Sequence, residues 1–281
     1  MKKRLIINLS LLILLLSLAA IAWLKPGQQI SEQLALVPID IANIDSIRIE
    51  RAQAETIELN KQQQQWRLIA PLKANALAGK LERLLKISQI KPVSSYPLEP
   101  ESMQRFGLQA AVAKIYFNDI EVLIGRTESV NSRRYASSSG QLHLLDDTFL
   151  HHLTAPLSAY IDNRLLADGA QVIALQTANL NLQRGDDNSW QNKFRPTQSV
   201  SADAVQILFD EWRFARAISV NEQLGTETGE SIRLQLSNQQ VRQFNLIRQQ
   251  NKVLLVDNNT RLAYQFSLTK YQQMSTLSEL E

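Results

Sequence analysis

The sequence predicts an α+β fold in which an N-terminal transmembrane helix precedes two tandem repeats of antiparallel strands, each with one packed helix. The first observation is a run of 20 uncharged residues, 5–24, long enough to cross a bilayer as a helix. The second is a pattern of alternating apolar residues, tryptophan and proline that begins near Ile44 and returns around Trp190. The third is helical spacing of apolar residues after each of these prolines.

Composition limits the possible functions. The chain has 281 residues with 44% hydrophobic content, enough for one large or two ordinary domains. Its formal charge of +3 equals the contribution of Lys2, Lys3 and Arg4, so the rest of the chain is neutral. A neutral folded part argues against nucleic-acid binding, which needs a basic surface. Because cysteine is absent, disulfides, thiolate nucleophiles and cysteine-bound metals are excluded.

The N-terminal segment predicts a membrane anchor. Three basic residues precede residues 5–24 and only Lys25 follows closely, so the positive-inside rule places residues 1–4 in the cytoplasm and the remainder across the membrane. A cleaved signal peptide is the alternative, since Ala20 and Ala22 offer small residues at a cleavage site. The apolar run exceeds the usual length of a signal sequence, which favours the anchor. Residues 25–43 are predicted to form a linker.

The first predicted repeat covers residues 44–166. Apolar and polar residues alternate in three short runs, the period of half-buried strands. The apolar residues of these runs are Ile47, Ile49, Ile57, Leu59, Trp66, Leu68 and Ala70. Four glutamines, residues 62–65, stand where the second hairpin should turn. A helix is predicted after Pro71, then hairpins that turn near Asn118 and near Gly140, and finally two short helices separated by Pro156.

The second predicted repeat covers residues 167–281 and follows the same order. Ile173, Leu175, Leu180 and Leu182 mark its first two strands, and residues 184–188 supply a strong turn before Trp190. After Pro196, Ser201 is a good N-cap for a helix, whose apolar stripe comprises Val205, Leu208, Phe209 and Trp212. Two more hairpins are predicted, with turns near Asn238 and at residues 257–259.

A set of landmarks in this order resembles a bacterial family of unknown function, numbered 4340. The landmarks are Trp66-Arg67-Leu68 with Pro71, Phe106-Gly107-Leu108, Ile124-Gly125, Arg134-Tyr135 and Ile161-Asp162-Asn163-Arg164-Leu165-Leu166. The resemblance covers nearly the whole chain, although Gln109 stands where the family commonly has proline and the second repeat matches less well.

The resemblance implies an accessory role. Members of the family are similar to companions of ABC-type complexes that resemble the gliding-motility transporter. It therefore implies a single-pass protein of the bacterial inner membrane with a periplasmic C-terminal part, and transporter-like permease and ATPase subunits as partners. The family has no established catalytic residues, so it implies none here.

One cluster could support metal or hydrolytic chemistry: Asp146, Asp147, His151 and His152. Asp147 and His151 are four residues apart, so one face of a helix could present both as ligands. The alternative is that Asp147 caps a helix beginning near Thr148, whose apolar residues pack inward. With no third ligand evident, the sequence assigns no catalytic, cofactor-binding or metal-binding residue.

Two further groups are interpreted as structural. Arg133 and Arg134 should point to opposite faces of a strand, which favours a solvated edge or an ion pair over an anion site. Trp66, Trp190 and Trp212 occupy equivalent or helix-stripe positions and are predicted to lie in the core.

The leading functional hypothesis is therefore a non-catalytic, membrane-anchored binding subunit that requires no cofactor. The alternatives are an exported carrier that holds a lipid or glycan between the repeats, and a metal-dependent hydrolase using Asp147 and His151.

Overall fold

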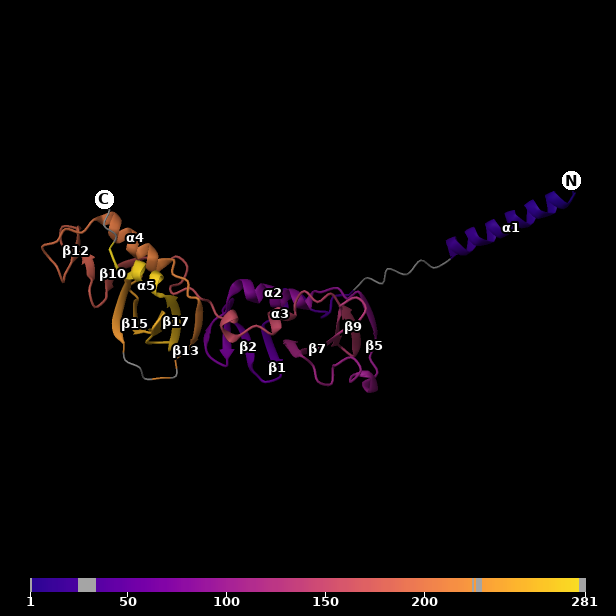
Figure 1. The fold of residues 1–281 in the computed structure, drawn as a ribbon, viewed down its shortest axis with the longest axis horizontal. Helices are drawn as coiled ribbons and strands as arrows, with labels where there is room; N and C mark the ends of the chain where they lie inside the picture. Colours follow the sequence, from indigo (N-terminus) through magenta and orange to yellow (C-terminus); the bar gives the residue numbers. More distant parts are fainter. Residues whose placement is uncertain (1, 25–33, 224, 226–228, 278–281) are drawn as a thin grey trace.

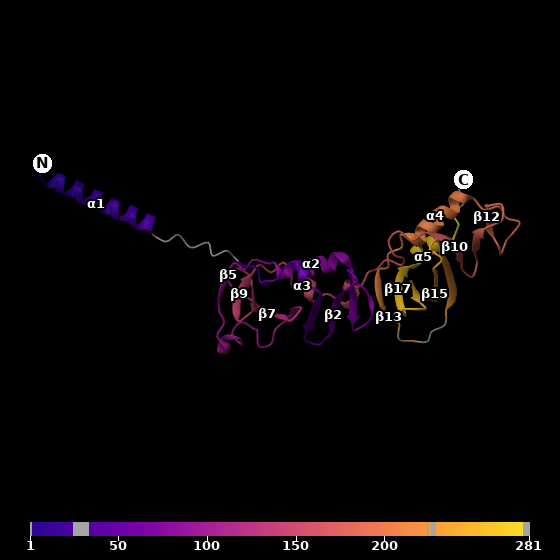
Figure 2. The ribbon, with the colours of Figure 1, turned by 180° about the vertical axis from the view of Figure 1, so that it is seen from behind.

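The computed structural model describes residues 2–24, 34–223, 225 and 229–277. Two antiparallel sheets lie side by side along the long axis of the molecule (Figure 1). The same arrangement is seen from behind in Figure 2, where the helices that follow the N-terminal one lie along one side of the two sheets. The sheet formed by residues 46–145, with the helices and turns that flank it, is called the first repeat, and the sheet formed by residues 172–267, with its flanking helices, is called the second repeat.

The first repeat contains a nine-stranded sheet in the order β4-β3-β2-β1-β6-β7-β8-β9-β5. Its strands are β1 (Ser46–Arg51), β2 (Ala54–Gln62), β3 (Gln65–Ala70), β4 (Ala74–Asn75), β5 (Ser94–Pro97), β6 (Ala113–Phe117), β7 (Ile120–Thr127), β8 (Arg134–Ser138) and β9 (Gln141–Leu145). Its helices are α2 (Ala78–Ser88) and α3 (Leu150–Leu153), with 3-10 turns at Ile41–Asn43, Pro100–Ser102 and Leu157–Tyr160.

The second repeat contains an eight-stranded sheet in the order β12-β11-β10-β14-β15-β16-β17-β13. Its strands are β10 (Val172–Gln176), β11 (Asn181–Arg184), β12 (Trp190–Asn192), β13 (Ser219–Glu222), β14 (Glu230–Leu236), β15 (Val241–Arg248), β16 (Lys252–Asp257) and β17 (Leu262–Ser267). Its helices are α4 (Ala202–Arg213) and α5 (Leu268–Ser275). Apart from the short β4, the two sheets match strand for strand in both order and chain position.

The predicted fold class is wrong in two respects. The second repeat carries a helix, α5, that was not predicted, whereas α3 in the first repeat lies where a short helix was predicted before Pro156. In addition, no helix in the described part of the chain is long and apolar enough to cross a membrane. The N-terminal helix α1 spans Lys2–Leu24.

Two predictions depend on the membrane anchor. The predicted transmembrane helix over residues 5–24 and the single-pass inner-membrane localisation with a periplasmic domain are both wrong. The predicted linker, residues 25–43, lies outside the described residues up to position 33. Beyond that point it packs on the first repeat, because Leu36 and Val37 are buried and their backbone N–H groups bond to Ile90 and Ser88.

The glutamine run forms the turn between β2 and β3. Gln63 and Gln64 both have positive φ, 48° and 67°, as in the type I′ turns that match the twist of a hairpin. The corresponding turn between β11 and β12 uses Asn188 at φ 64°. Two different sequences thus close equivalent hairpins, because the strands on each side fix the backbone path.

One strand prediction fails at the start of the second repeat. Ile173 was expected to face the core with Leu175, but it is exposed while Val172 is buried. The pairing of β10 with β14 shifts register between Val172 and Ala174. This irregularity changes which residue faces inward, since side chains in a regular strand alternate strictly between faces.

A single large hydrophobic core continues through both repeats. Tyr160, Ile161, Leu165 and Leu166, which connect the sheets, are buried within it. The backbone of this connector pairs with both sides, since Asp162 N–H bonds to Asn75 O at 2.8 Å and Leu165 N–H bonds to Ala215 O at 3.1 Å. The connector therefore fixes the two repeats relative to each other.

Candidate functional site

The predicted Asp146–His152 cluster is not arranged as a metal site. Asp147 forms a salt bridge with the buried Arg134 (Nη2–Oδ2 2.6 Å), and Asp146 pairs with Arg133 at 3.3 Å. The helix begins at Leu150 and receives no side-chain cap, so the predicted capping role of Asp147 is also wrong. Within the described ranges no group of three or more His, Cys, Asp or Glu side chains could hold a metal ion.

The ion-pair interpretation of the two arginines is confirmed. Arg134 also donates to Gly125 O at 2.7 Å and to Thr127 Oγ1 at 3.0 Å, so β7 and β8 are joined by a buried guanidinium. Arg133 is the more exposed of the pair. Arg134 therefore has a structural role between these strands.

The three histidines lie in two settings. His151 is exposed, and its ring lies beside that of His152, tilted by 52° with the centroids 3.8 Å apart. His143 is buried in β9, where Nδ1 and Ser95 Oγ are 2.8 Å apart. Burial lowers the pKa of His143, so this ring is neutral near pH 7.

The three tryptophans differ in burial. Trp212 in α4 is fully buried, as predicted. Trp66 and Trp190 are partly buried and pack against the edge of the core, with Trp190 in an edge-to-face contact with Phe209 (centroids 5.2 Å apart). Only Trp212 is thus a central core residue.

A cleft of about 930 Å³ lies where the two repeats meet. One wall comes from the β3–β4 edge of the first repeat, the floor from the connector, and the other wall from β15, β17 and the turns beside them. Its charged lining residues are Arg67, Lys73, Asp162, Arg164, Arg242 and Asp257. These residues come from segments almost 200 positions apart, so only the packing of the two repeats brings them together.

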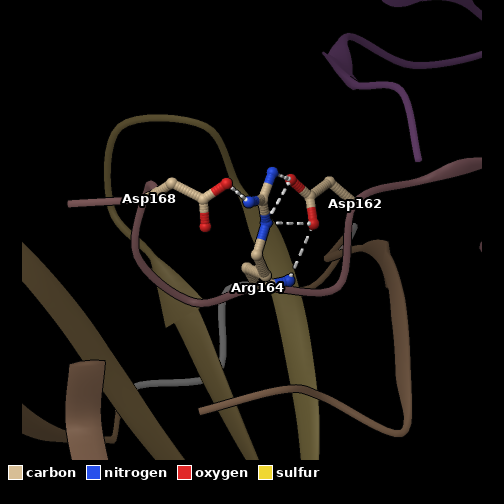
Figure 3. Close-up of polar contacts among 3 residues, drawn as sticks. All are labelled: Asp162, Arg164 and Asp168. Atoms are coloured by element: carbon tan, nitrogen blue, oxygen red, sulfur yellow. Dashed lines mark hydrogen bonds and ion pairs between the residues drawn. The ribbon is translucent and has the colours of Figure 1, made fainter. Parts of the chain in front are cut away.

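Arg164 is held between two carboxylates at the floor of the cleft (Figure 3). Its Nε lies 3.0 and 2.9 Å from the two carboxylate oxygens of Asp162, and its Nη1 contacts Asp168. Hydrogen bonds that Arg164 donates to these two carboxylates raise the pKa of Arg164, and accepting one of them lowers the pKa of Asp168. Arg164 is therefore neutralised by the connector itself.

Arg242 is neutralised from within the second repeat. Its Nε lies 3.1 Å from Asp257 Oδ2, and Asp257 is only 1% exposed. The other carboxylate oxygen accepts the backbone N–H groups of Asn259 at 2.8 Å and Thr260 at 3.0 Å. This network fixes the turn between β16 and β17 at the wall of the cleft.

Arg67 and Lys73 are the remaining cations of the cleft. Both are exposed, and neither has an acidic partner within 4 Å among the residues that the structure describes. Since the two carboxylates of the lining are engaged by Arg164 and Arg242, the cleft has a net positive charge. An anionic group could therefore enter without displacing an existing ion pair.

Sequence reasoning offered a ligand site between the repeats as an alternative but named none of the residues that line this cleft. The stretch from Ile161 to Leu166 was noted as a landmark of the family resemblance, but no function was attached to it. The signal that could have revealed it is a group of charged residues, Asp162, Arg164 and Asp168, directly between the repeats. An analysis of hydrophobic periodicity alone does not consider charged residues.

A second group of cations lies at the start of α2. Lys80 is 9% exposed, and its Nζ lies 4.7 Å from the centre of the Tyr160 ring. Burial, with repulsion from Arg83 and Arg51, lowers the pKa of Lys80 to about 8. The Nε of Arg51 is buried without a hydrogen-bond partner in the described structure. The charged form of Lys80 is therefore destabilising at neutral pH.

This predicts a measurable pH dependence of stability. The folded-state pKa of about 8 lies below the unfolded value of 10.5, so the folded chain loses its proton first as pH rises. The free energy of unfolding should therefore rise by up to about 3 kcal/mol from pH 7 to pH 10.5 relative to Lys80→Met, which lacks the titration. Urea denaturation across this range measures the difference. In the exposed Lys86→Met variant, the free energy of unfolding should change with pH as it does in the wild type. The same change with pH in Lys80→Met would contradict the prediction.

Comparison with protein-family models, curated proteins and solved structures gives no match. The resemblance to family 4340 therefore remains a prediction from the residues quoted for it.

Proposed function

We propose that this protein is a non-catalytic accessory subunit that binds an acidic segment of a partner protein in the cleft between its repeats. The observation that carries the proposal is the pair of uncompensated cations, Arg67 and Lys73, at a cleft whose other charges are already paired. An acidic segment would form charge-assisted hydrogen bonds with both side chains, and these are stronger than bonds between neutral groups.

The rigidity of the junction supports a binding role. The connector is hydrogen bonded to both repeats, and Leu165 and Leu166 are buried between them. A preformed cleft loses little conformational entropy when a ligand binds, so more of the interaction energy appears as affinity. The family resemblance suggests the partners: permease and ATPase subunits of an ABC-type transporter.

The test is co-purification with a matched charge control. Tagged full-length chain, extracted in mild detergent, is expected to recover permease and ATPase subunits identified by mass spectrometry. The Arg67→Gln/Lys73→Gln variant should reduce recovery at least tenfold, since each lost charge-assisted contact weakens binding by about 1.5–3 kcal/mol. The control Lys91→Gln/Arg126→Gln removes one lysine and one arginine from exposed positions outside the cleft.

Two results would contradict the proposal. Equal recovery by the cleft variant and the control would show that the cleft is not the docking surface. Failure of the wild-type chain to recover such subunits would remove the transporter assignment.

A second candidate function is an acidic-glycan carrier, because the cleft of about 930 Å³ lies between the repeats, where the carrier hypothesis places its ligand. The charged lining argues against a lipid chain, since burying Arg and Asp side chains against hydrocarbon is costly. Titration with galacturonate oligosaccharides, followed by calorimetry, distinguishes this candidate: binding that is lost in Arg67→Gln/Lys73→Gln supports the carrier role.

A further inference from the structure

A smaller hollow lies at the opposite edge of the first repeat. It has a volume of about 350 Å³ and is lined by residues of β5, β8 and β9 together with the segments around Glu99, Phe106 and Glu128. Since β5 is the outermost strand of its sheet and the cleft borders β3 and β4, the two hollows lie at opposite ends of the strand order. We call this hollow the aromatic pocket.

The pocket is built on a small core of its own. Leu108, Leu123 and Leu142 form a buried cluster separate from the main core, and Phe106 and Tyr135 pack against it. The backbone of Phe106 is fixed to β7, because its carbonyl accepts Arg126 N–H at 3.0 Å. Gly125 permits this approach, since a Cβ there would lie 2.4 Å from Phe106 O. The walls of the pocket are therefore firmly positioned.

Three aromatic rings line the pocket. Phe106 and Tyr135 are tilted by 52° with centroids 4.8 Å apart, so they form two adjoining walls. Tyr96 in β5 is 56% exposed, so its ring is accessible to a ligand in the pocket. The faces of such rings carry negative electrostatic potential and attract cations, and the Arg105 guanidinium carbon already lies 5.7 Å from the centre of the Phe106 ring.

Two carboxylates complete the lining. Neither Glu99 nor Glu128 has a Lys or Arg nitrogen within 4 Å in the described ranges of the chain. One oxygen of Glu128 accepts Asn131 N–H at 3.2 Å, which leaves the other free. His143 also lines the pocket, but burial lowers its pKa, so it adds no positive charge near pH 7.

We propose that the aromatic pocket binds an organic cation of the alkylammonium or guanidinium type. The rings would contact the apolar surface and charge of the cation, and Glu99 and Glu128 would supply the countercharge. Such cations are weakly hydrated compared with metal ions, which suits a pocket of mixed aromatic and acidic lining. The proposal is independent of the cleft, whose free charges have the opposite sign.

The test uses two cations and their neutral counterparts. Calorimetric titration of the full chain with tetramethylammonium and with N-acetylarginine amide should show saturable binding that weakens with salt. tert-Butanol and N-acetylcitrulline amide, which have similar shapes without charge, should bind at least tenfold more weakly. Binding of tetramethylammonium alone assigns an ammonium ligand, whereas binding of the arginine derivative alone assigns a guanidinium ligand.

Matched variants locate the site. Tyr96→Ala and Glu99→Gln/Glu128→Gln should each weaken cation binding at least fivefold, whereas Phe214→Ala, an exposed ring elsewhere, and Glu121→Gln, which contacts Tyr116, should leave it unchanged. Circular dichroism confirms that each variant is folded. Absence of binding by either cation, equal binding of the neutral compounds, or equal affinity in the Tyr96 and glutamate variants would overturn the proposal.

Discussion

Trp212→Ala is expected to lower the free energy of unfolding by about 3–5 kcal/mol, because it removes the largest fully buried side chain of the second repeat. The ring lies in α4 against α5, and its Nε1 donates to Met274 O at 2.6 Å. The variant therefore creates a cavity and also leaves a buried carbonyl without its donor. Urea denaturation of the full chain measures the loss.

Two control variants test how much of the loss comes from the hydrogen-bond donor and how much from the buried position of Trp212. Trp212→Phe keeps much of the apolar volume but removes the donor, so its cost should lie well below that of the alanine variant. Trp190→Ala truncates a partly buried ring at the edge of the core and should cost about 1–2 kcal/mol. If Trp190→Ala destabilised as much as Trp212→Ala, the central position of Trp212 would be contradicted.

Asp257→Ala is expected to destabilise the second repeat by about 3–5 kcal/mol. Removing this buried carboxylate leaves the Arg242 guanidinium without its countercharge and two backbone N–H groups of the β16–β17 turn without their acceptor. The same change loosens one wall of the cleft. Thermal and urea denaturation, read by far-UV circular dichroism, measure the effect.

Asp168→Ala is the matched control. Asp168 also contacts an arginine of the junction, but its side chain is 83% exposed and Arg164 keeps Asp162 as a partner. Its removal should change stability by less than about 1 kcal/mol, as is typical of exposed ion pairs. A similar cost for both substitutions would show that burial does not determine the strength of these pairs.

Much of the local structure was predictable from the sequence. Ser201 was expected to cap a helix and does so, with its Oγ accepting Ala204 N–H at 3.5 Å, and the apolar stripe of α4 is buried as predicted. The hairpin turns near Asn118 and Gly140 are also confirmed, since both residues have positive φ. These features depend on residues only a few positions apart, so a local pattern contains the necessary information.

The errors arose where distant partners compete with local preference. Asp147 has the chemistry and position of a helix cap, but the buried Arg134 on the neighbouring strand takes its carboxylate and the helix begins three residues later. Ile173 follows the alternation of its strand, but a register shift against β14 turns it outward. In both cases a contact with a distant part of the chain stabilises the observed structure more than the local preference, which is worth about 1 kcal/mol, stabilises the predicted one.

The sequence by itself determined the duplication and the succession of strands and turns along the chain, because alternation and turn residues act over a few positions. Tertiary structure alone decided the two hollows. Arg67 and Arg242 face one cleft only because the connector fixes the repeats together, and Tyr96 meets Phe106 and Tyr135 only because β5 crosses over to pair with β9. Which charges remain unpaired likewise depends on contacts between segments far apart in the chain, and no local pattern encodes them.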